Sequence, residues 1–456
     1  MNIIIQIHIM YMQLLLLFIT LTVIIPLGNA QRVKQITYKE KPRGTDSLEI
    51  CEGILSQRAM RIKYKRNRKN IATITLSEPI MVAMADQEEG WGFFQFPYIS
   101  EAPNGTLRIE WSMNEDSYVS YGKGPAKPYT PMISKDRGKT WIPQDKGYFT
   151  FNKGYSALLR DGSRISIITS PVTDVRQYSS FPKAVAIGTW KTFYLHEDLP
   201  DELKGVYLNH WDARFKYEKI HSKIVDPGVL RHSINNFMPI SWWGELKELS
   251  DGSLLAGVYP TNYIEENGQI SSSSVSFYKS NDKGNTWIRT GRIPVLNDGI
   301  MNVVGDSRFE EPTFEILRDS TLICVLRSGS YSPLYKTFSK DKGCTWSSPV
   351  PFTPNGVKPN LLLLKNGVLV LASGRPGIQL RFCFKGDGVQ WSQPVDMIPI
   401  KKSNRDVNKD VSCGYVTLLE ADEKSFYMVY SDFTTLNENK ETRKSIWFRK
   451  ITINLK

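Results

Sequence analysis

Short apolar strands that follow polar turns recur along this chain. Each unit begins with a turn signal such as Asn-Gly or Asp-Gly and continues into a mostly apolar run. Long amphipathic helical patterns are hard to find. The pattern therefore predicts an all-β protein in which each unit supplies a central strand. The six units are Asn104–Ile109, Asp161–Ile167, Asp251–Leu255, Arg318–Val325, Asn366–Leu371 and Glu423–Val429.

A second repeat, with the pattern S-x-D-x-G-x-T-W, predicts a specific tight turn. We expect its Asp to accept hydrogen bonds from backbone N–H groups of the turn, and its Gly to take positive φ. The Trp is expected to pack beneath the turn. A fourth segment, Phe384–Trp391, is a degenerate copy with Gly386 in place of the Asp. The three full copies are Ser134–Trp141, Ser280–Trp287 and Ser339–Trp346.

These copies resemble the Asp-box (BNR) repeat of sialidase-type β-propellers. The resemblance implies an all-β, six-bladed β-propeller of four-stranded antiparallel blades, which we place at residues 76–456. The six turn-and-strand units fit six such blades. Asp-boxes lie on the outer turns of blades, so the resemblance alone leaves function open.

The N-terminus predicts export. The first 30 residues contain no Lys, Arg, Asp or Glu, and Gly28 and Ala30 fit a small-residue cleavage site. We interpret residues 1–30 as a signal peptide, with an uncleaved membrane anchor as the alternative. The mature protein is then secreted or periplasmic, without a stable membrane anchor. Residues 31–75 are expected to form either a strand that closes the ring or a tail.

The chain has a net charge of +12, which favours an acidic oligosaccharide or polysaccharide as partner for an exported protein. A surface that is charged for solubility is the alternative. No nucleic-acid recognition motif is evident, so we expect no nucleic-acid partner. The five cysteines show no metal-ligand spacing, and we expect neither metal nor cofactor. Cys324 and Cys383 lie in apolar runs and are expected to be buried thiols.

The resemblance also implies site residues, because sialidase-type sites combine a Tyr nucleophile, a Glu as its base and an arginine triad that binds the substrate carboxylate. Glu311 matches the Glu, with Glu310 as an adjacent rival. Arg327, which ends the following strand pattern, matches the second triad Arg, and Arg375 matches the third. Tyr415 fits the nucleophile by its order in the chain.

Two further positions are compared with the sialidase pattern, and one of them departs from it. Gln95, in the segment Phe94–Pro97, stands where sialidases have the first triad Arg. A neutral amide cannot form the charged bidentate pair with a carboxylate, so the chain reads as sialidase-like rather than as a true sialidase. Asp116 matches the acid that protonates the leaving oxygen, with Glu115 as its rival.

His232 has no counterpart in the sialidase pattern. It lies in the longest interval between units, residues 168–250, which we expect to form loops over one face. A His or Tyr near groups that neutralise a carboxylate suits β-elimination at a uronic acid. In the same interval, Trp242 and Trp243 form either a sugar-stacking platform or part of the core.

Three functions follow from these residues. The first is hydrolysis of a terminal acidic sugar, with uronic acid favoured over sialic acid, by Tyr415, Glu311 and Asp116. The second is elimination by a lyase or dehydratase that uses His232 or Tyr415. The third is glycan binding without catalysis, which explains an incomplete arginine triad most simply.

Overall fold

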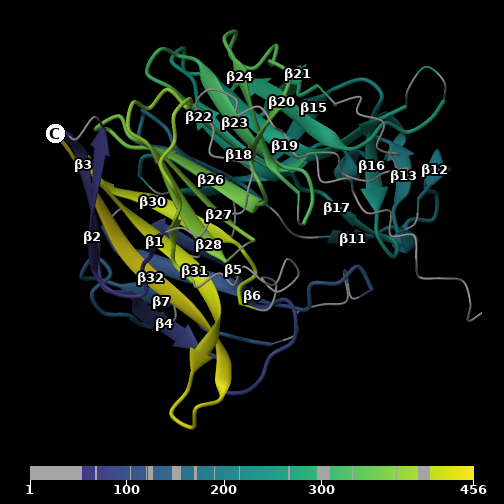
Figure 1. Ribbon diagram of the computed structural model, residues 1–456. Coiled ribbons are helices and arrows are strands. Elements are labelled where there is room, and N and C mark those ends of the chain that lie inside the picture. Colours follow the sequence, from purple (N-terminus) through teal and green to yellow (C-terminus); the bar gives the residue numbers. More distant parts are fainter. Residues whose placement is uncertain are drawn as a thin grey trace, which may run out of the picture. The chain divides into compact units, whose positions relative to one another are not determined.

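Antiparallel strands make up most of the regular structure in the computed structural model (Figure 1). The structure describes residues 54–456, except 67–68, 103, 120, 122–126, 146–155, 169–171, 189, 215, 265, 267, 295–308, 331, 376 and 399–410. The expected signal peptide, residues 1–30, lies outside this part. None of the helices in these ranges is long and apolar enough to cross a membrane. The helices are η1 (Val175–Gln177), η2 (His196–Asp198) and η3 (Asp201–Leu203).

Three sheets contain a four-stranded antiparallel run in which neighbours in sequence pair with each other. The first run is β5 (Phe93–Glu101), β6 (Leu107–Met113), β7 (Met132–Ser134) and β8 (Ile142–Pro143). The second is β22 (Glu310–Ile316), β23 (Leu322–Arg327), β24 (Leu334–Ser339) and β25 (Val350–Thr353). The third is β26 (Val357–Leu363), β27 (Leu369–Gly374), β28 (Ile378–Cys383) and β29 (Val395–Asp396). The short β1 (Ile54–Leu55) adds to β29 in parallel.

An 11-stranded sheet joins two further antiparallel runs through the parallel pairing of β15 with β21. One run is β9 (Ser156–Leu158), β10 (Arg164–Ile167), β14 (Val206–Trp211) and β15 (Tyr217–Val225). The other is β18 (Trp243–Glu248), β19 (Leu254–Tyr263), β20 (Ser274–Ser280) and β21 (Thr286–Arg292). The sheet continues from β19 into β16 (Val229–Ser233), β13 (Thr192–Leu195) and β12 (Ala186–Ile187).

The last sheet combines both ends of the described chain. Its C-terminal part is β30 (Val416–Asp422), β31 (Ser425–Leu436) and β32 (Thr442–Leu455). Its N-terminal part is β2 (Met60–Arg66), β3 (Lys69–Leu76) and β4 (Ile80–Met84). β3 and β4 both pair antiparallel with β32, and Figure 1 shows β2 and β3 beside the C-terminus. The predicted boundary at residue 75 thus falls within β3.

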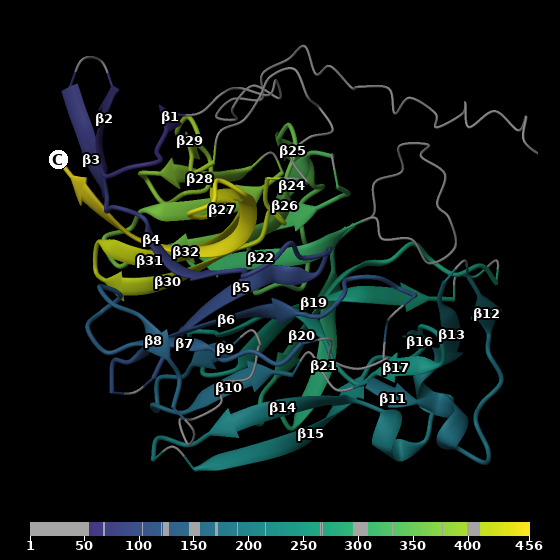
Figure 2. The ribbon, with the colours of Figure 1, turned by 90° about the horizontal axis from the view of Figure 1, so that it is seen from below.

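All six predicted central strands are strands of the structure. Five of them are the second strand of a four-stranded antiparallel run, and the sixth, β31, lies between β30 and β32. The apolar core fills the spaces between successive sheets, which Figure 2 shows layered one above another. Phe277 on β20, for example, meets Phe314 on β22 with ring centroids 5.4 Å apart. An all-β fold of mainly antiparallel sheets is therefore confirmed, while a propeller of six blades in a closed ring stays a prediction.

The expectation of plain loops over residues 168–250 was wrong. The interval contains the three short helices and a separate two-stranded sheet, β11 (Val172–Asp174) with β17 (Phe237–Pro239), besides β12, β13 and β16. Its apolar residues, among them Tyr194, Leu199, Leu203 and Met238, form a small core of their own. That core stabilises the strands and forms only when the interval folds, so the local pattern did not reveal them.

The three full repeats have the turn chemistry that the pattern predicts. In the first, the Asp136 carboxylate accepts bonds from the backbone N–H groups of Lys139 and Thr140 at 3.0 and 2.9 Å. Gly138 takes a φ of 86°, and its N–H donates to the Ser134 hydroxyl at 2.8 Å. In the degenerate copy Asp387 accepts the turn N–H instead, at 2.9 Å from the nitrogen of Val389.

These turns also fit closely against neighbouring sheets, which gives a test of the fold. A Cβ on Gly138 lies 2.2 Å from the Phe448 ring, so Gly138→Ala combines an unfavourable φ with a steric clash. We expect it to lower the free energy of unfolding by about 2–3 kcal/mol in urea titrations. Gly252→Ala is the matched control, because Gly252 has a similar φ of 84° and open space around it. Equal losses in both variants contradict the packing.

Candidate active site

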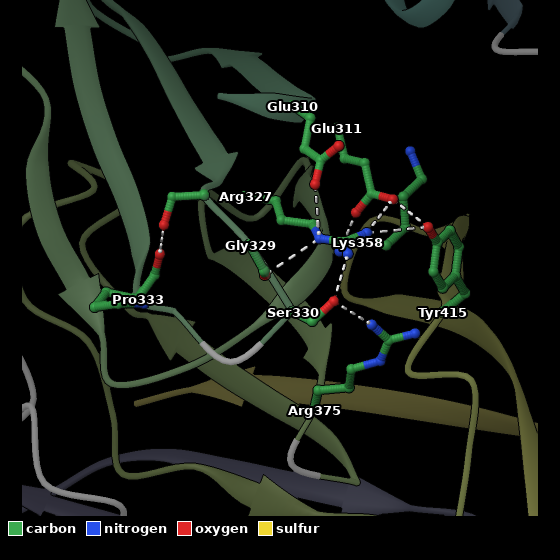
Figure 3. Close-up of polar contacts among 10 residues, drawn as sticks. Glu310, Glu311, Arg327, Gly329, Ser330, Pro333, Lys358, Arg375 and Tyr415 are labelled. Carbon is green, nitrogen blue, oxygen red and sulfur yellow. Dashed lines mark hydrogen bonds and ion pairs between the residues drawn. The ribbon is translucent and has the colours of Figure 1, made fainter. Parts of the chain in front are cut away.

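Glu311, Arg327, Arg375 and Tyr415 come together at the ends of strands from three different sheets (Figure 3). Glu311 Oε1 accepts a short hydrogen bond from the Tyr415 hydroxyl and lies 2.8 Å from Arg327 Nη1. Arg327 Nη1 lies 3.4 Å from the Tyr415 oxygen. The Ser330 hydroxyl links the two arginines, at 3.2 Å from a guanidinium nitrogen of each.

Irregular backbone at the strand ends positions these side chains. Glu311 (φ 48°) and Lys358 (φ 39°) both lie where the pairing register shifts, and a bulge of this kind changes the direction of a side chain. Arg375, directly after β27, has a φ of 47°. Positive φ at residues other than glycine is sparsely populated and clusters at functional sites.

A close approach of two glycines places Arg375 beside Tyr415. A Cβ on Gly374 lies 2.1 Å from the Gly414 Cα, so that neither backbone tolerates a side chain there. Each glycine directly precedes a site residue in the sequence. The contact therefore fixes the ends of β27 and β30 against each other and brings both functional side chains to one place.

The Glu311 carboxylate is buried yet ionised. Burial favours its neutral form, but the Arg327 cation and the Lys358 backbone N–H, 2.7 Å from Oε2, favour the charged form, and the pKa of Glu311 lies below its ordinary value. Burial and the Glu311 charge raise the pKa of Tyr415 well above its usual range. The pair therefore rests as a carboxylate that accepts a hydrogen bond from a neutral tyrosine hydroxyl, the arrangement of a nucleophile beside its base.

Glu310 lies on the other side of Arg327. Its Oε1 is 3.2 Å from Arg327 Nε, and burial raises its pKa against the attraction of that cation. The short hydrogen bond from Tyr415 goes to Glu311. The geometry thus gives Glu311 the place of the base and leaves Glu310 as a second partner of Arg327.

Arg375 is a buried cation without a carboxylate. Its side chain donates to the Ser330 hydroxyl, and its guanidinium carbon lies 5.6 Å from the centre of the Trp91 ring. Its Nε has no hydrogen-bond partner, and no ion pair involves Arg375 in the part of the chain that the structure describes. A buried guanidinium of this kind is costly unless an anion binds to it.

Asp116 joins the cluster through the same tryptophan. Its Oδ2 accepts a bond of 2.9 Å from the Trp91 indole N–H, while the Trp91 ring contacts Arg375. Asp116 lies after β6, in the loop that leads towards β7. The structure therefore brings Asp116 to the rim of the site, where the Trp91 side chain contacts both Asp116 and Arg375.

Gln95 lies on β5 between two register shifts and is fully buried. Neither polar atom of its side chain has a hydrogen-bond partner in the described structure. The neighbouring Phe96 packs edge-on against Tyr415, with ring centroids 4.6 Å apart. Gln95 thus adjoins the cluster and has unused hydrogen-bonding capacity.

His232, on β16, is not part of the hydrogen-bonded cluster within the described residues. It packs between Phe193 and Trp243, with ring centroids 6.2 and 6.5 Å away, and burial holds its pKa well below the ordinary value. Within the described ranges, no hydrogen bond joins it to Tyr415 or Glu311. Trp242 belongs to the core, where it meets Tyr278 and Trp287, whereas Trp243 is half-buried. A role for His232 as a base stays a prediction.

Three residues of the cluster were not foreseen. Trp91 contacts Asp116 and Arg375, Ser330 bridges the two arginines, and the Lys358 N–H binds Glu311. Only Trp91 left a signal, as an aromatic residue next to the segment that contains Gln95. Groups of three or more His, Cys, Asp or Glu able to hold a metal ion are absent from the described ranges.

No protein-family model matches the chain, and no curated protein matches it. A solved structure of a protein of unknown function from Dyadobacter fermentans DSM 18053 is 16% identical with a TM-score of 0.52, over 84% of this chain and 99% of that one.

Sialidases and an arabinanase are also similar in structure. The Hadza microbial sialidase Hz136 is 14% identical (TM-score 0.43), over 79% of this chain and 65% of that one. The Penicillium chrysogenum alpha-L-arabinanase is 17% identical (TM-score 0.44), over 82% and 98%. The chain thus resembles sialidase-type β-propellers, and likenesses this distant assign no activity.

Proposed function

We propose that this protein is an exported glycoside hydrolase that removes a terminal acidic sugar, with six propeller blades around its site. One observation carries the proposal: the Tyr415 hydroxyl donates to the ionised Glu311 carboxylate near Arg375, a buried cation that forms no ion pair within the described residues. A nucleophile with its base and a cation nearby suit cleavage of the glycosidic bond of a sugar that carries a carboxylate.

In the proposed mechanism Tyr415 attacks the anomeric carbon while Glu311 accepts its proton. Asp116 donates a proton to the leaving oxygen, and the bond between sugar and aglycone breaks. The result is a glycosyl–tyrosine intermediate, a variation on the usual carboxylate nucleophile. Asp116 then takes a proton from water, which attacks the same carbon and releases the sugar. Glu311 returns the proton to Tyr415.

Arg375 is the proposed anchor for the substrate carboxylate. Arg327 already faces two carboxylates, Glu310 and Glu311, so most of its charge is compensated. Gln95 adds a neutral amide where sialidases have a third arginine. Because Gln95 stands where sialidases have an arginine, the site departs from the sialidase pattern, and we favour a uronic acid over sialic acid as its substrate.

An assay with two substrate classes tests the proposal. Sialosides and oligosaccharides that end in a uronic acid are incubated with the protein, and released sugar is measured together with ultraviolet absorbance of an unsaturated uronate. We expect uronic acid release without the absorbance. Growth of the absorbance band instead indicates elimination, and binding without either product indicates a glycan-binding protein; both results contradict the proposal.

A further inference from the structure

A pocket of about 450 Å³ opens beside Trp91, which contacts the proposed acid, and its other lining residues lie outside the cluster described above. Trp91 and Phe433 form its aromatic wall, with ring centroids 6.4 Å apart and the rings nearly perpendicular. Glu89, Arg443 and Lys444 form much of the rest. Its volume lies in the range of pockets that bind small ligands.

Trp91 belongs to both the pocket and the site. The indole N–H bonds to Asp116 and the ring contacts Arg375, while the same side chain lines the pocket. The pocket therefore shares one wall, Trp91, with the site, and the proposed acid lies at the indole N–H of that wall.

Three of the four charged side chains that line the pocket have partners, and the fourth, Glu88, is exposed. Both Glu89 oxygens lie 2.8 Å from Lys127 Nζ, and Arg443 Nη2 lies 2.5 Å from Glu441. Lys444 donates to the Gly90 carbonyl, 2.5 Å away, and its charge lies 4.5 Å from the centre of the Phe433 ring. Two carboxylates and two cations line the pocket, so its lining has no net charge that favours a ligand of either sign.

We infer that this pocket binds the sugar on the leaving side of the cleaved bond, and that this sugar is an uncharged pyranose stacked on Trp91. The aromatic wall offers the apolar face that the C–H groups of a sugar ring contact, and the polar rim offers bonds to its hydroxyls. The inference rests on the proposed function, because Asp116 defines which side is the leaving side.

The test compares two substrates of the same acidic sugar: a disaccharide with a neutral leaving sugar, and the methyl glycoside, which has no second ring. Phe433→Leu removes the aromatic support behind Trp91, and Thr442→Met fills the pocket from its exposed rim. We expect the ratio of kcat/KM for disaccharide over methyl glycoside to fall about tenfold in Phe433→Leu, and in the same direction in Thr442→Met. Leu436→Met, on the same hairpin but outside the pocket, is the control.

The outcomes distinguish a failure of the proposed sugar-binding pocket from a failure of the proposed hydrolysis. A ratio that stays constant in both variants, while the wild type cleaves both substrates, overturns the pocket and leaves the proposed function standing. A sulfated leaving sugar that is cleaved more efficiently than the neutral one also overturns it. If the wild type cleaves neither substrate, the proposed function fails. Saturation-transfer NMR with methyl β-D-galactopyranoside and methyl β-D-glucopyranoside then decides: signals weakened by Phe433→Leu support the pocket, and their absence in the wild type overturns it.

Discussion

Tyr415→Phe is expected to lower kcat for a terminal acidic sugar by about 10³-fold or more, while KM changes little. The substitution removes the oxygen that attacks the anomeric carbon and keeps the ring that packs against Phe96. Glu311 keeps its bonds to Arg327 and to the Lys358 N–H, so its charge stays compensated. The free energy of unfolding should therefore change by only about 1 kcal/mol.

Tyr427→Phe is the matched control. Tyr427 is also buried, on β31, and packs against Phe448 in the core between β31–β32 and β5–β6, away from Glu311. Steady-state kinetics with a uronic acid glycoside and urea unfolding measure both variants. If Tyr415→Phe keeps more than about a tenth of the wild-type kcat, Tyr415 is not the nucleophile, since no other hydroxyl bonds to Glu311 in the described structure.

The strand pattern could be predicted because it depends on local sequence. A turn followed by an apolar run indicates the second strand of a hairpin wherever it occurs, and all six such runs are strands. Arg327 and Arg375 lie at the ends of two of these runs, whereas Glu311 and Tyr415 lie at the starts of other strands. These four residues were predicted from the resemblance to the sialidase pattern, because strand positions alone do not single them out.

The contacts that connect the site could not be predicted, because they depend on tertiary structure. Trp91 and Arg375 are far apart in the sequence, and nothing local indicates their contact. The positive φ of Glu311 and Lys358 is equally hidden, since neither residue type favours it. The extra strands within residues 168–250 owe their stability to a small core that forms only when the interval folds.

Arg375→Met is expected to lower kcat/KM for acidic substrates by about 10²-fold or more without lowering the free energy of unfolding. The substitution removes the cation that is proposed to pair with the substrate carboxylate, and a bidentate pair of this kind contributes several kcal/mol when buried. It also removes a buried charge without a carboxylate partner, whose desolvation is unfavourable in the free protein. Arg375→Met should thus lower kcat/KM while the free energy of unfolding stays the same or rises.

Arg449→Met is the comparison variant, because Arg449 is a buried arginine whose guanidinium is hydrogen-bonded within the protein. Arg449 is fully buried, and its guanidinium donates to the backbone carbonyls of Ser56, Arg58 and Ser77. Its loss leaves these carbonyls unpaired where the N-terminal strands meet β32, and we expect about 3–5 kcal/mol of destabilisation in urea unfolding. If Arg375→Met destabilises the protein as much as Arg449→Met does, Arg375 is a structural cation. Its guanidinium is then satisfied without substrate, and the proposed carboxylate anchor is wrong.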